Sequence, residues 1–488
     1  MVKRLPTLYF GAAEAPPLGM AEFLGDADPA DYGADSIGVE WARELATERG
    51  TDLLVLTGPD GPGVLADLAD KIADNNGTIT ASTQVSIGDR ALIVATFDLP
   101  GTTHRGADQV ADSLKGVADG WEVWRAPLQR GIGEPVAGLP WRIWAWVDDE
   151  TNALDLLASA GDLMEEHGVV ASRVRSYPSR SKGGIRWLVI IEYSLAFRDL
   201  AKEFRAQLSQ LGARYGVRPE DCSKAQVASY EQRFATPEPL SKERSAVGII
   251  VVPAHRKLLN RVTSFLASID ATPISGDEAT LAGTSVEMFS MTRLQRHHIV
   301  TFSTVVPKGL DLNEWRDRMK GSLAERVAEV TRSYPGTDAS AIHPYISVLA
   351  DPVPSDHDPT PMGPPHYVEV RAPEIPGILA TTARAISDVG GNIESLISKV
   401  KDRDQEITCE IQMRTRLPLE SDKEPEELHA EVHRRLQITL QKQGVSLDAL
   451  DRLTVAEAKL APSGDFIRQG DEHYMWAQPI GPFQQAAI

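Results

Sequence analysis

The sequence contains only two cysteines, Cys222 and Cys409, among its 488 residues. Two thiols cannot build a disulfide framework or a zinc site by themselves, so we expect both to be reduced in a cytoplasmic protein. Long hydrophobic runs are missing too, since no stretch approaches the about 18 apolar residues that a membrane helix needs. The N-terminal region lacks the apolar core of a signal peptide, because prolines and glutamates interrupt it. We therefore expect no membrane partner.

Basic residues are also scarce relative to acidic ones, with 50 Lys and Arg against 69 Asp and Glu and a net charge of −19. This charge repels phosphate backbones, so we expect no nucleic-acid partner. The chain also lacks a G-x-S-x-G turn, a Walker A loop, an H-E-x-x-H pair and a G-x-G-x-x-G loop after a strand. We accordingly predict no catalytic residues, no metal site and no cofactor.

What the chain does contain is a weak internal repeat. Four segments, at residues 51–127, 140–230, 244–350 and 366–459, follow the order strand, helix, strand, strand, helix, strand. Residues 1–50 and 460–488 lie outside the repeat as terminal extensions, and proline-rich linkers separate the segments, most clearly at 351–365. This order predicts an α+β protein of four tandem ferredoxin-like βαββαβ modules, each an antiparallel sheet with two helices on one face.

The first strand–helix pair of each segment is the most distinct part of this pattern. The first strands are predicted at 52–57, 141–147, 247–252 and 367–371, and the helices after them at 64–72, 151–167, 256–269 and 376–389. Further helices are predicted at 107–117, 197–211, 312–333 and 425–443, and last strands at 121–125, 224–229 and 452–457. Trp144 and Trp146 alternate onto the face without helices, which favours packing between modules over a ligand platform.

Two segments share a local motif at the turn between the first strand and the first helix. It is an acidic residue, any residue, Pro-Gly and two aliphatic residues, at Asp60–Leu65 and again at Glu374–Leu379. A second match, Gly77-Thr78-Ile79 and Gly391-Asn392-Ile393, begins the following strand.

The residue types in this motif suit a helix start that binds a small molecule. Proline suits the first helical turn, and glycine permits close approach of a ligand or another backbone. The free N–H groups at a helix start favour a carboxylate. The acidic side chain would cap the helix or receive an ammonium group, so the motif could bracket an α-amino acid. The alternative is that the same turn serves folding alone.

These motifs resemble the ACT domain, a small-molecule-sensing module of amino-acid metabolism, strongly in the first segment and well in the fourth. The resemblance implies an amino acid bound at a module interface. The implied ligand contacts are Asp60, Gly61, Gly63, Val64, Thr78, Ile79, Glu374, Gly377, Ile378, Leu379, Asn392 and Ile393.

The second and third segments lack the motif, with Asp148-Asp149-Glu150 and Pro253-Ala254-His255 at the corresponding turns. We interpret them as structural spacers that pair with the outer modules, and we place no ligand there. Neighbouring His297 and His298 point to opposite faces of a strand, so they should not chelate a metal together.

The leading hypothesis is therefore a non-catalytic tandem-repeat regulator that binds an amino acid and transmits the signal to a partner enzyme or regulator protein. Homo-oligomerisation is expected through free sheet edges. One alternative is an interaction scaffold without ligand. The other is an enzyme of amino-acid or folate-like metabolism, with Asp60, Glu374 and His255 as the suspected acid–base groups.

Overall fold

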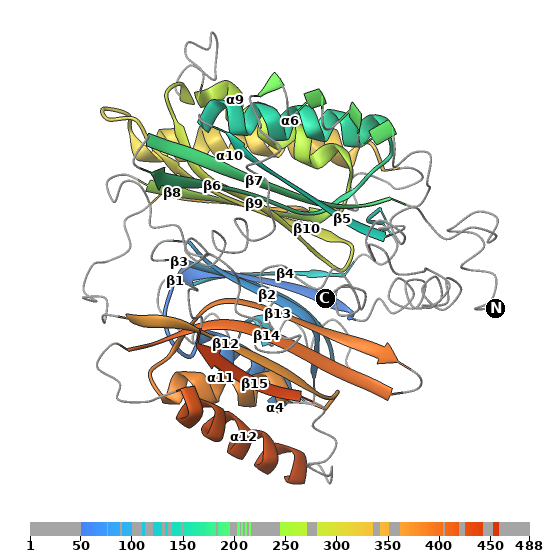
Figure 1. Cartoon of the computed structure of the whole chain (residues 1–488), viewed down its shortest axis with the longest axis vertical. Helices are drawn as coiled ribbons and strands as arrows, with labels where there is room; N and C mark the ends of the chain where they lie inside the picture. The colour runs from blue at the N-terminus through green and yellow to red at the C-terminus, as the bar shows by residue number, and fades with distance from the viewer. Residues whose placement is uncertain are drawn as a thin grey trace, which may run out of the picture. The chain divides into compact units, whose positions relative to one another are not determined.

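The computed structural model shows an α+β protein with two antiparallel sheets (Figure 1). The description that follows covers residues 50–75, 77–87, 90–99, 110–112, 121–128, 132–134, 139–147, 150–181, 184–195, 203–204, 206–207, 210–211, 214–215, 245–270, 281–334, 342–350, 362–375, 377–403, 406–418, 425–442 and 452–457. The predicted extensions 1–50 and 460–488, the helices at 107–117 and 197–211 and the strand at 224–229 lie wholly or largely outside these residues.

The chain forms two compact units, and among the described residues one is inserted in the sequence of the other. The described residues of the first, which we call the continuous unit, lie within Gln129–Pro352, and the split unit combines Thr47–Leu128 with Val353–Leu460. The split unit therefore contains the segments predicted as the first and fourth modules, and the continuous unit contains the second and third.

The split unit has an eight-stranded sheet in the order β15-β12-β14-β13-β2-β3-β1-β4. Its strands are β1 (Asp52–Pro59), β2 (Thr78–Ile87), β3 (Arg90–Asp98), β4 (Glu122–Pro127), β12 (Met362–Pro373), β13 (Asn392–Arg403), β14 (Glu406–Pro418) and β15 (Arg452–Glu457). Its helices are α4 (Val64–Asp74), α11 (Ile378–Asp388) and α12 (Pro425–Lys442), which lie on one face of the sheet (Figure 1).

The continuous unit has a seven-stranded sheet in the order β11-β8-β10-β9-β6-β7-β5. Its strands are β5 (Leu139–Val147), β6 (Ala171–Ser181), β7 (Gly184–Leu195), β8 (Ser245–Pro253), β9 (Ser285–Leu294), β10 (His297–Val305) and β11 (Tyr345–Leu349). Its helices are α6 (Glu150–Glu166), α9 (Lys257–Asp270) and α10 (Leu312–Thr331), again on one face (Figure 1).

The pairing of segments differs from the prediction. Strand β2 pairs with β13, so the first segment joins the fourth, and β6 pairs with β9, so the second joins the third. The expectation that the middle segments pair with the outer ones is therefore wrong. In a single segment, the second strand lies at the edge of the sheet and can pair with another segment. The hydrophobic pattern of that strand predicts which side chains face the core, but it does not predict which strand pairs with the edge.

The join between β2 and β13 has nearly two-fold symmetry. Residues 314 positions apart occupy equivalent places, as Gly63 and Gly377 do at the starts of α4 and α11. Thr83 pairs with Ile397, and these two residues are also 314 positions apart. Each of them is therefore paired with its own symmetry equivalent. The local two-fold axis thus passes through this residue pair.

The same irregularity marks the second strand of each of the four segments, which is the first strand of its hairpin. One extra residue interrupts the ladder just after the strand begins, which is a β-bulge. The extra residues are Thr80 in β2, Ser172 in β6, Glu287 in β9 and Glu394 in β13. Each bulge lies beside the join between segments, where it bends the strand that carries the pairing.

The core of the split unit lies between its sheet and its helices. Helix α4 buries Leu65, Leu68 and Ile72 at helical spacing, and α11 does the same with its own apolar face. Burial of each such side chain contributes about 1.5–3 kcal/mol relative to exposure. One boundary was predicted too late: β12 begins at Met362, so the last residues of the expected linker 351–365 belong to a strand.

Candidate functional site

Both motif turns adopt the same backbone conformation. Gly63 and Gly377 immediately precede α4 and α11 with φ of 94° and 91°, values in the left-handed region that only glycine adopts without strain. Each glycine carbonyl accepts the first helical hydrogen bond at 2.8 Å, from Asp67 and Thr381 respectively.

Two details of the predicted turn are corrected by this geometry. The glycine caps each helix, and no side chain makes a capping hydrogen bond there. Asp60 and Glu374 are therefore not helix caps. Pro62 precedes the capping glycine, so it lies outside the first helical turn that the sequence suggested for it.

The two halves of the motif meet across the join between segments. Asn392, the first residue of β13, donates a hydrogen bond from Nδ2 to Oδ2 of Asp60 at 3.0 Å. Asp60 belongs to the turn after β1, 332 residues away in the chain. The turn of one segment thus faces the second strand of the other, and the antiparallel β2–β13 pairing produces this crossing.

We call the first crossing the Asp60 junction, made of Asp60, Asn392, Ser86 and Glu394. Oδ1 of Asp60 and Oδ1 of Asn392 are buried without a hydrogen-bond partner among the described residues. Glu394 forms ion pairs with the Nε atoms of Arg414 at 2.9 Å and of Arg416. The junction therefore contains buried oxygen acceptors beside an ion-paired carboxylate.

Burial raises the pKa of the Asp60 carboxyl group from 3.8 to about 6. The side chains of Ser86 and Asn392 oppose this effect by stabilising the carboxylate, and the charge of Glu394 adds to it. Asp60 is thus a carboxyl group whose protonation changes close to neutral pH.

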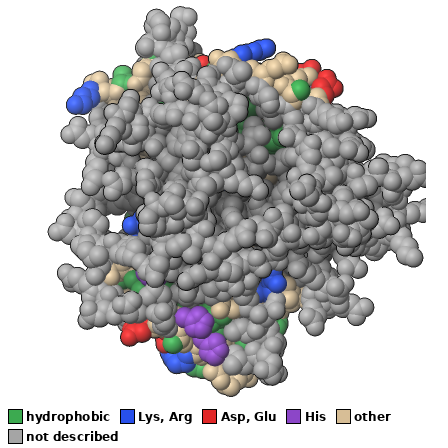
Figure 2. Space-filling view, viewed as in Figure 1, with side chains coloured by type: hydrophobic (Ala, Val, Ile, Leu, Met, Phe, Trp, Pro, Cys, Tyr) green, Lys and Arg blue, Asp and Glu red, His purple; other side chains and the backbone are tan. Residues whose placement is uncertain are grey.

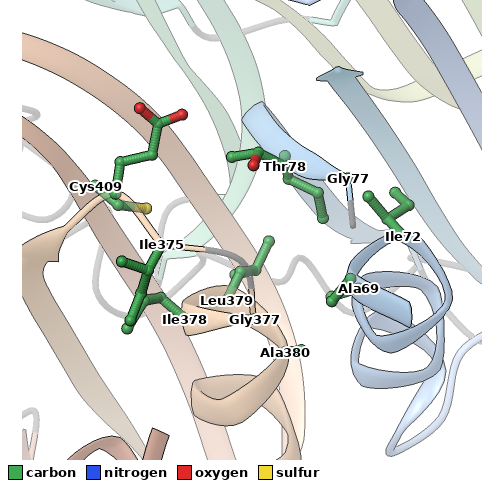
Figure 3. A pocket seen from close by; sticks show the side chains of 13 residues that line it. Ala69, Ile72, Gly77, Thr78, Ile375, Gly377, Ile378, Leu379, Ala380 and Cys409 are labelled. Atoms are coloured by element: carbon green, nitrogen blue, oxygen red, sulfur yellow. The ribbon is translucent and has the colours of Figure 1, made fainter. Parts of the chain in front are cut away.

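We call the second crossing the Glu374 pocket (Figure 3). It lies where the turn after β12 and the start of α11 face α4 and the start of β2, and it is a shallow pocket that opens to solvent. The lining residues are Ala69, Ile72, Ala73, Gly77, Thr78, Ile79, Glu374, Ile375, Gly377, Ile378, Leu379, Ala380 and Cys409.

The lining of the Glu374 pocket is predominantly aliphatic. Its polar side chains are the carboxyl group of Glu374, the hydroxyl of Thr78 and the thiol of Cys409. Burial raises the pKa of the Cys409 thiol to about 12, with the charges of Glu374 and Glu410 adding to the effect. Cys409 is therefore a neutral thiol that behaves as a small apolar group.

The structure distributes the twelve predicted contacts between the two crossings. Six line the Glu374 pocket, namely Thr78, Ile79, Glu374, Gly377, Ile378 and Leu379. Asp60 and Asn392 bond to each other in the Asp60 junction, Gly61 and Gly63 belong to its turn, and Val64 and Ile393 pack with the hydrophobic core. Sequence reasoning missed the α4 side of the pocket, including Ile72 and Ala73, because it placed both halves of each motif in one segment.

The turn after β8 in the continuous unit is filled by side chains of its own. His255 stacks edge-on against Tyr334, with ring centroids 4.8 Å apart, and its Nε2 lies 3.8 Å from Oε1 of Glu134. Burial lowers the pKa of His255, although Glu134 opposes the shift. The equivalent turn of the second segment, Asp148-Asp149, lies outside the described residues.

Histidines gather visibly on one surface in Figure 2, in the region where Figure 1 draws α12. Helix α12 carries His429 and His433 one turn apart, with nearly parallel rings 6.3 Å apart. His297 and His298 are buried in β10. The described part of the chain contains no group of three or more metal-ligating side chains. None of its helices is long and apolar enough to cross a membrane.

Comparison with known families gives one match, to the ACT domain, over residues 52–122. The chain carries an ACT domain there. The match covers β1, α4, β2 and β3, which contribute the Asp60 turn and the Thr78 side of the Glu374 pocket. No curated protein matches the sequence.

Solved structures give distant similarities. The aspartate kinase of Synechocystis is 14% identical with a TM-score of 0.27, over 81% of this chain and 55% of that one. An unknown protein from Galdieria sulphuraria is 12% identical with a TM-score of 0.29, over 35% of this chain and 95% of that one. A protein described as a glycine cleavage system transcriptional repressor is 8% identical with a TM-score of 0.28, over 34% and 92%. At these values none of them decides a function, and the chain spans about half of the aspartate kinase.

Proposed function

We propose that this protein is a non-catalytic regulator of amino-acid metabolism, built from four ACT-like modules, that senses an amino acid where modules meet. The observation that carries the proposal is the crossing of the motif halves. The turn of one segment and the second strand of the other together offer an acidic side chain, a helix start and a polar strand residue, with Asp60 opposite Asn392 and Glu374 beside Thr78.

The repeat itself is supported by the bulges. Each of the four segments carries one extra residue near the start of its second strand, and the bulged strands are the ones that join the segments in pairs. Arg175 lies opposite Ser290, 115 positions away, which is also the spacing of the bulged residues Ser172 and Glu287. The join in the continuous unit thus has the same internal symmetry as the one in the split unit, as expected for two pairs of one module.

An α-amino acid matches the chemistry of these crossings. Its ammonium group would pair with the carboxylate of Asp60 or Glu374. Its carboxylate would accept hydrogen bonds from the free N–H groups at the start of α4 or α11, where the helix dipole favours an anion. Both charges of the ligand would then be matched, which burial of a zwitterion requires.

Signal transmission would follow from the position of the crossings at the join between segments. A ligand that contacts both segments favours one arrangement of the two over others, and a partner that reads this arrangement is thereby coupled to the ligand. We propose a target enzyme or regulator protein as that partner, a cytoplasmic location and homo-oligomers formed through other sheet edges.

Thermal unfolding of the purified full chain with each of the twenty amino acids tests the proposal. A ligand that binds only the folded state adds about 2.7 kcal/mol of stability at 100 times its dissociation constant. We expect one amino acid, or a small related group, to raise the melting temperature.

Two variants and a control locate the binding. The response should weaken in at least one of Glu374→Gln and Asp60→Asn, according to which crossing holds the ligand, and persist in Glu427→Gln, which alters an exposed carboxylate on α12. The amino-acid sensor is rejected if the chain is folded by circular dichroism and no amino acid shifts its melting temperature.

A further inference from the structure

The two crossings share a backbone but differ in their side chains. Equivalent positions 314 residues apart hold Asp60 and Glu374, Ser86 and Val400, Asn392 and Thr78, and Ser387 and Ala73. At three of these four positions, the Asp60 junction has a longer or more polar side chain able to hydrogen-bond within the protein. The two symmetry-related crossings therefore carry side chains with different chemical properties.

The Asp60 junction is partly closed by its own side chains. Asn392 donates to Oδ2 of Asp60 at 3.0 Å, so one oxygen of the carboxylate is engaged within the protein, while Oδ1 has no hydrogen-bond partner among the described residues. A Cβ atom built on Gly63 would lie 3.9 Å from Cβ of Ser387. A Cβ atom built on Gly377, the equivalent glycine, meets no atom within 4 Å. The turn at Gly377 thus faces open space where the turn at Gly63 faces α11.

The Glu374 pocket opens into that space. Its floor and walls come from α4, β2, α11 and β14, and Figure 3 shows aliphatic side chains from α4 and α11 on opposite sides of it. Thr78 is half-buried and is the polar side chain that β2 contributes to the lining. A polar head group is therefore matched at one place, beside Glu374 and the start of α11, while the rest of the lining is apolar.

We propose that each chain binds one amino acid with an uncharged aliphatic side chain in the Glu374 pocket, while the Asp60 junction stays closed by its own side chains. This inference rests on the proposed amino-acid sensing and adds the ligand class and the number of sites.

The lining selects the ligand class by desolvation. An aliphatic side chain among Ile72, Ile375 and Leu379 gains by leaving water. An acidic side chain would meet the carboxylate of Glu374, and a lysine or arginine side chain would lose hydration with no second carboxylate among the lining residues to replace it. Alanine, valine, leucine and isoleucine are thus the expected group.

Isothermal titration calorimetry of the full chain with leucine, isoleucine, valine, alanine, lysine and aspartate tests class and number together. We expect binding of one or more of the four aliphatic amino acids at one site per chain, and at least tenfold weaker binding of lysine and aspartate, a factor that corresponds to about 1.4 kcal/mol.

A matched pair of variants locates the site. Ala73→Leu extends a half-exposed side chain of α4 into the Glu374 pocket, and Ser387→Leu makes the equivalent change on α11 at the Asp60 junction. We expect Ala73→Leu to weaken binding at least about tenfold and Ser387→Leu to leave it unchanged. Circular dichroism and thermal unfolding establish that both variants are folded, and Ala73→Ser provides a smaller change if Ala73→Leu does not fold.

The outcomes separate this inference from the proposed function. Binding of two amino acids per chain, binding lost in Ser387→Leu but kept in Ala73→Leu, or a preference for a charged amino acid would overturn the inference and leave the sensor intact. Absence of binding by all six amino acids, in a folded chain, would overturn the inference, and the sensor falls as well only if none of the twenty amino acids raises the melting temperature.

Discussion

Asp60 is a residue of the split unit whose pKa in the folded chain lies well away from its ordinary value. Its carboxyl group is buried beside Glu394, and its pKa is raised from 3.8 to about 6. An acid whose pKa is raised on folding holds its proton more tightly in the folded state than in the unfolded state. The folded state is therefore most favoured at low pH, and this advantage is lost as the pH rises from about 4 to about 6.

Asp60→Asn tests this directly. The amide cannot ionise, so the stability of the variant relative to the natural chain should rise by about 2 kcal/mol from pH 4.5 to pH 8, since one pKa unit corresponds to 1.36 kcal/mol. Urea unfolding followed by circular dichroism at the two pH values measures the difference. Asp74→Asn, at an exposed residue of α4, is the control and should show no such trend. An equal effect of both substitutions would show that burial of Asp60 does not control its protonation.

The sequence predicted the residue types of the site better than their contacts. Asp60, Asn392, Glu374 and Thr78 all follow from the repeated motif, because a turn motif is local and can be seen in the residues. The partner of each does not follow, since it depends on strand pairing between residues 332 positions apart. The Ala73 side of the pocket could not be predicted, because it carries no motif. Small aliphatic residues on a helix are normally interpreted as part of the hydrophobic core.

At the scale of elements, the helices were predicted closely because their apolar residues recur with a helical period. The predicted helix at 256–269 lies at Lys257–Asp270, and that at 425–443 lies at Pro425–Lys442. The contact between helices was not predicted. Gly161 of α6 lies against the backbone of α9, where a Cβ atom would come within 2.6 Å of the Asn260 nitrogen. Nδ2 of Asn260 in turn donates to the carbonyl of Ala158 at 3.1 Å.

Gly161→Val should therefore separate α6 from α9. Overpacking of this kind destabilises a protein by about 1–3 kcal/mol, and valine adds little helix propensity to offset it. Gly321→Val is a matched control, because Gly321 lies inside α10 and a Cβ atom there meets nothing within 4 Å. Chemical denaturation of the two variants measures the difference. If both variants lose the same stability, the close approach of α6 and α9 does not determine which side chains are tolerated at position 161.

At the scale of the whole molecule, the two units should respond to acid in opposite directions. Burial lowers the pKa of His297 to about 4 and of His298 to about 3 in the continuous unit, with Arg293 adding to both shifts. The folded state thus holds these histidines neutral. Their contribution to stability is complete above pH 6.5 and is lost as the pH falls toward 4, whereas the raised pKa of Asp60 favours the split unit over the same range.

Lowering the pH from 7 to 5 should destabilise the continuous unit by about 2 kcal/mol for each of the two histidines, with no such loss in the split unit. Hydrogen–deuterium exchange with mass spectrometry, corrected for the intrinsic rate at each pH, measures the stability of each unit through its own peptides. Replacing His297 by Gln should remove part of the acid sensitivity of the continuous unit. Equal destabilisation of both units in acid would contradict this prediction.

The nesting of one unit in the sequence of the other has a consequence for synthesis on the ribosome. Strand β2 cannot pair with β13 until β13 has been synthesised, 314 residues later. Synthesis of those residues takes about 15–60 s at 5–20 residues per second. The segment Gln129–Pro352 of the continuous unit emerges in the meantime and can fold first. Strand β2, Thr78–Ile87, carries no charged residue or proline to block pairing with foreign strands, and its bulge at Thr80 is the protective feature of this edge. We expect nascent chains that stop before residue 392 to expose this edge and to recruit chaperones.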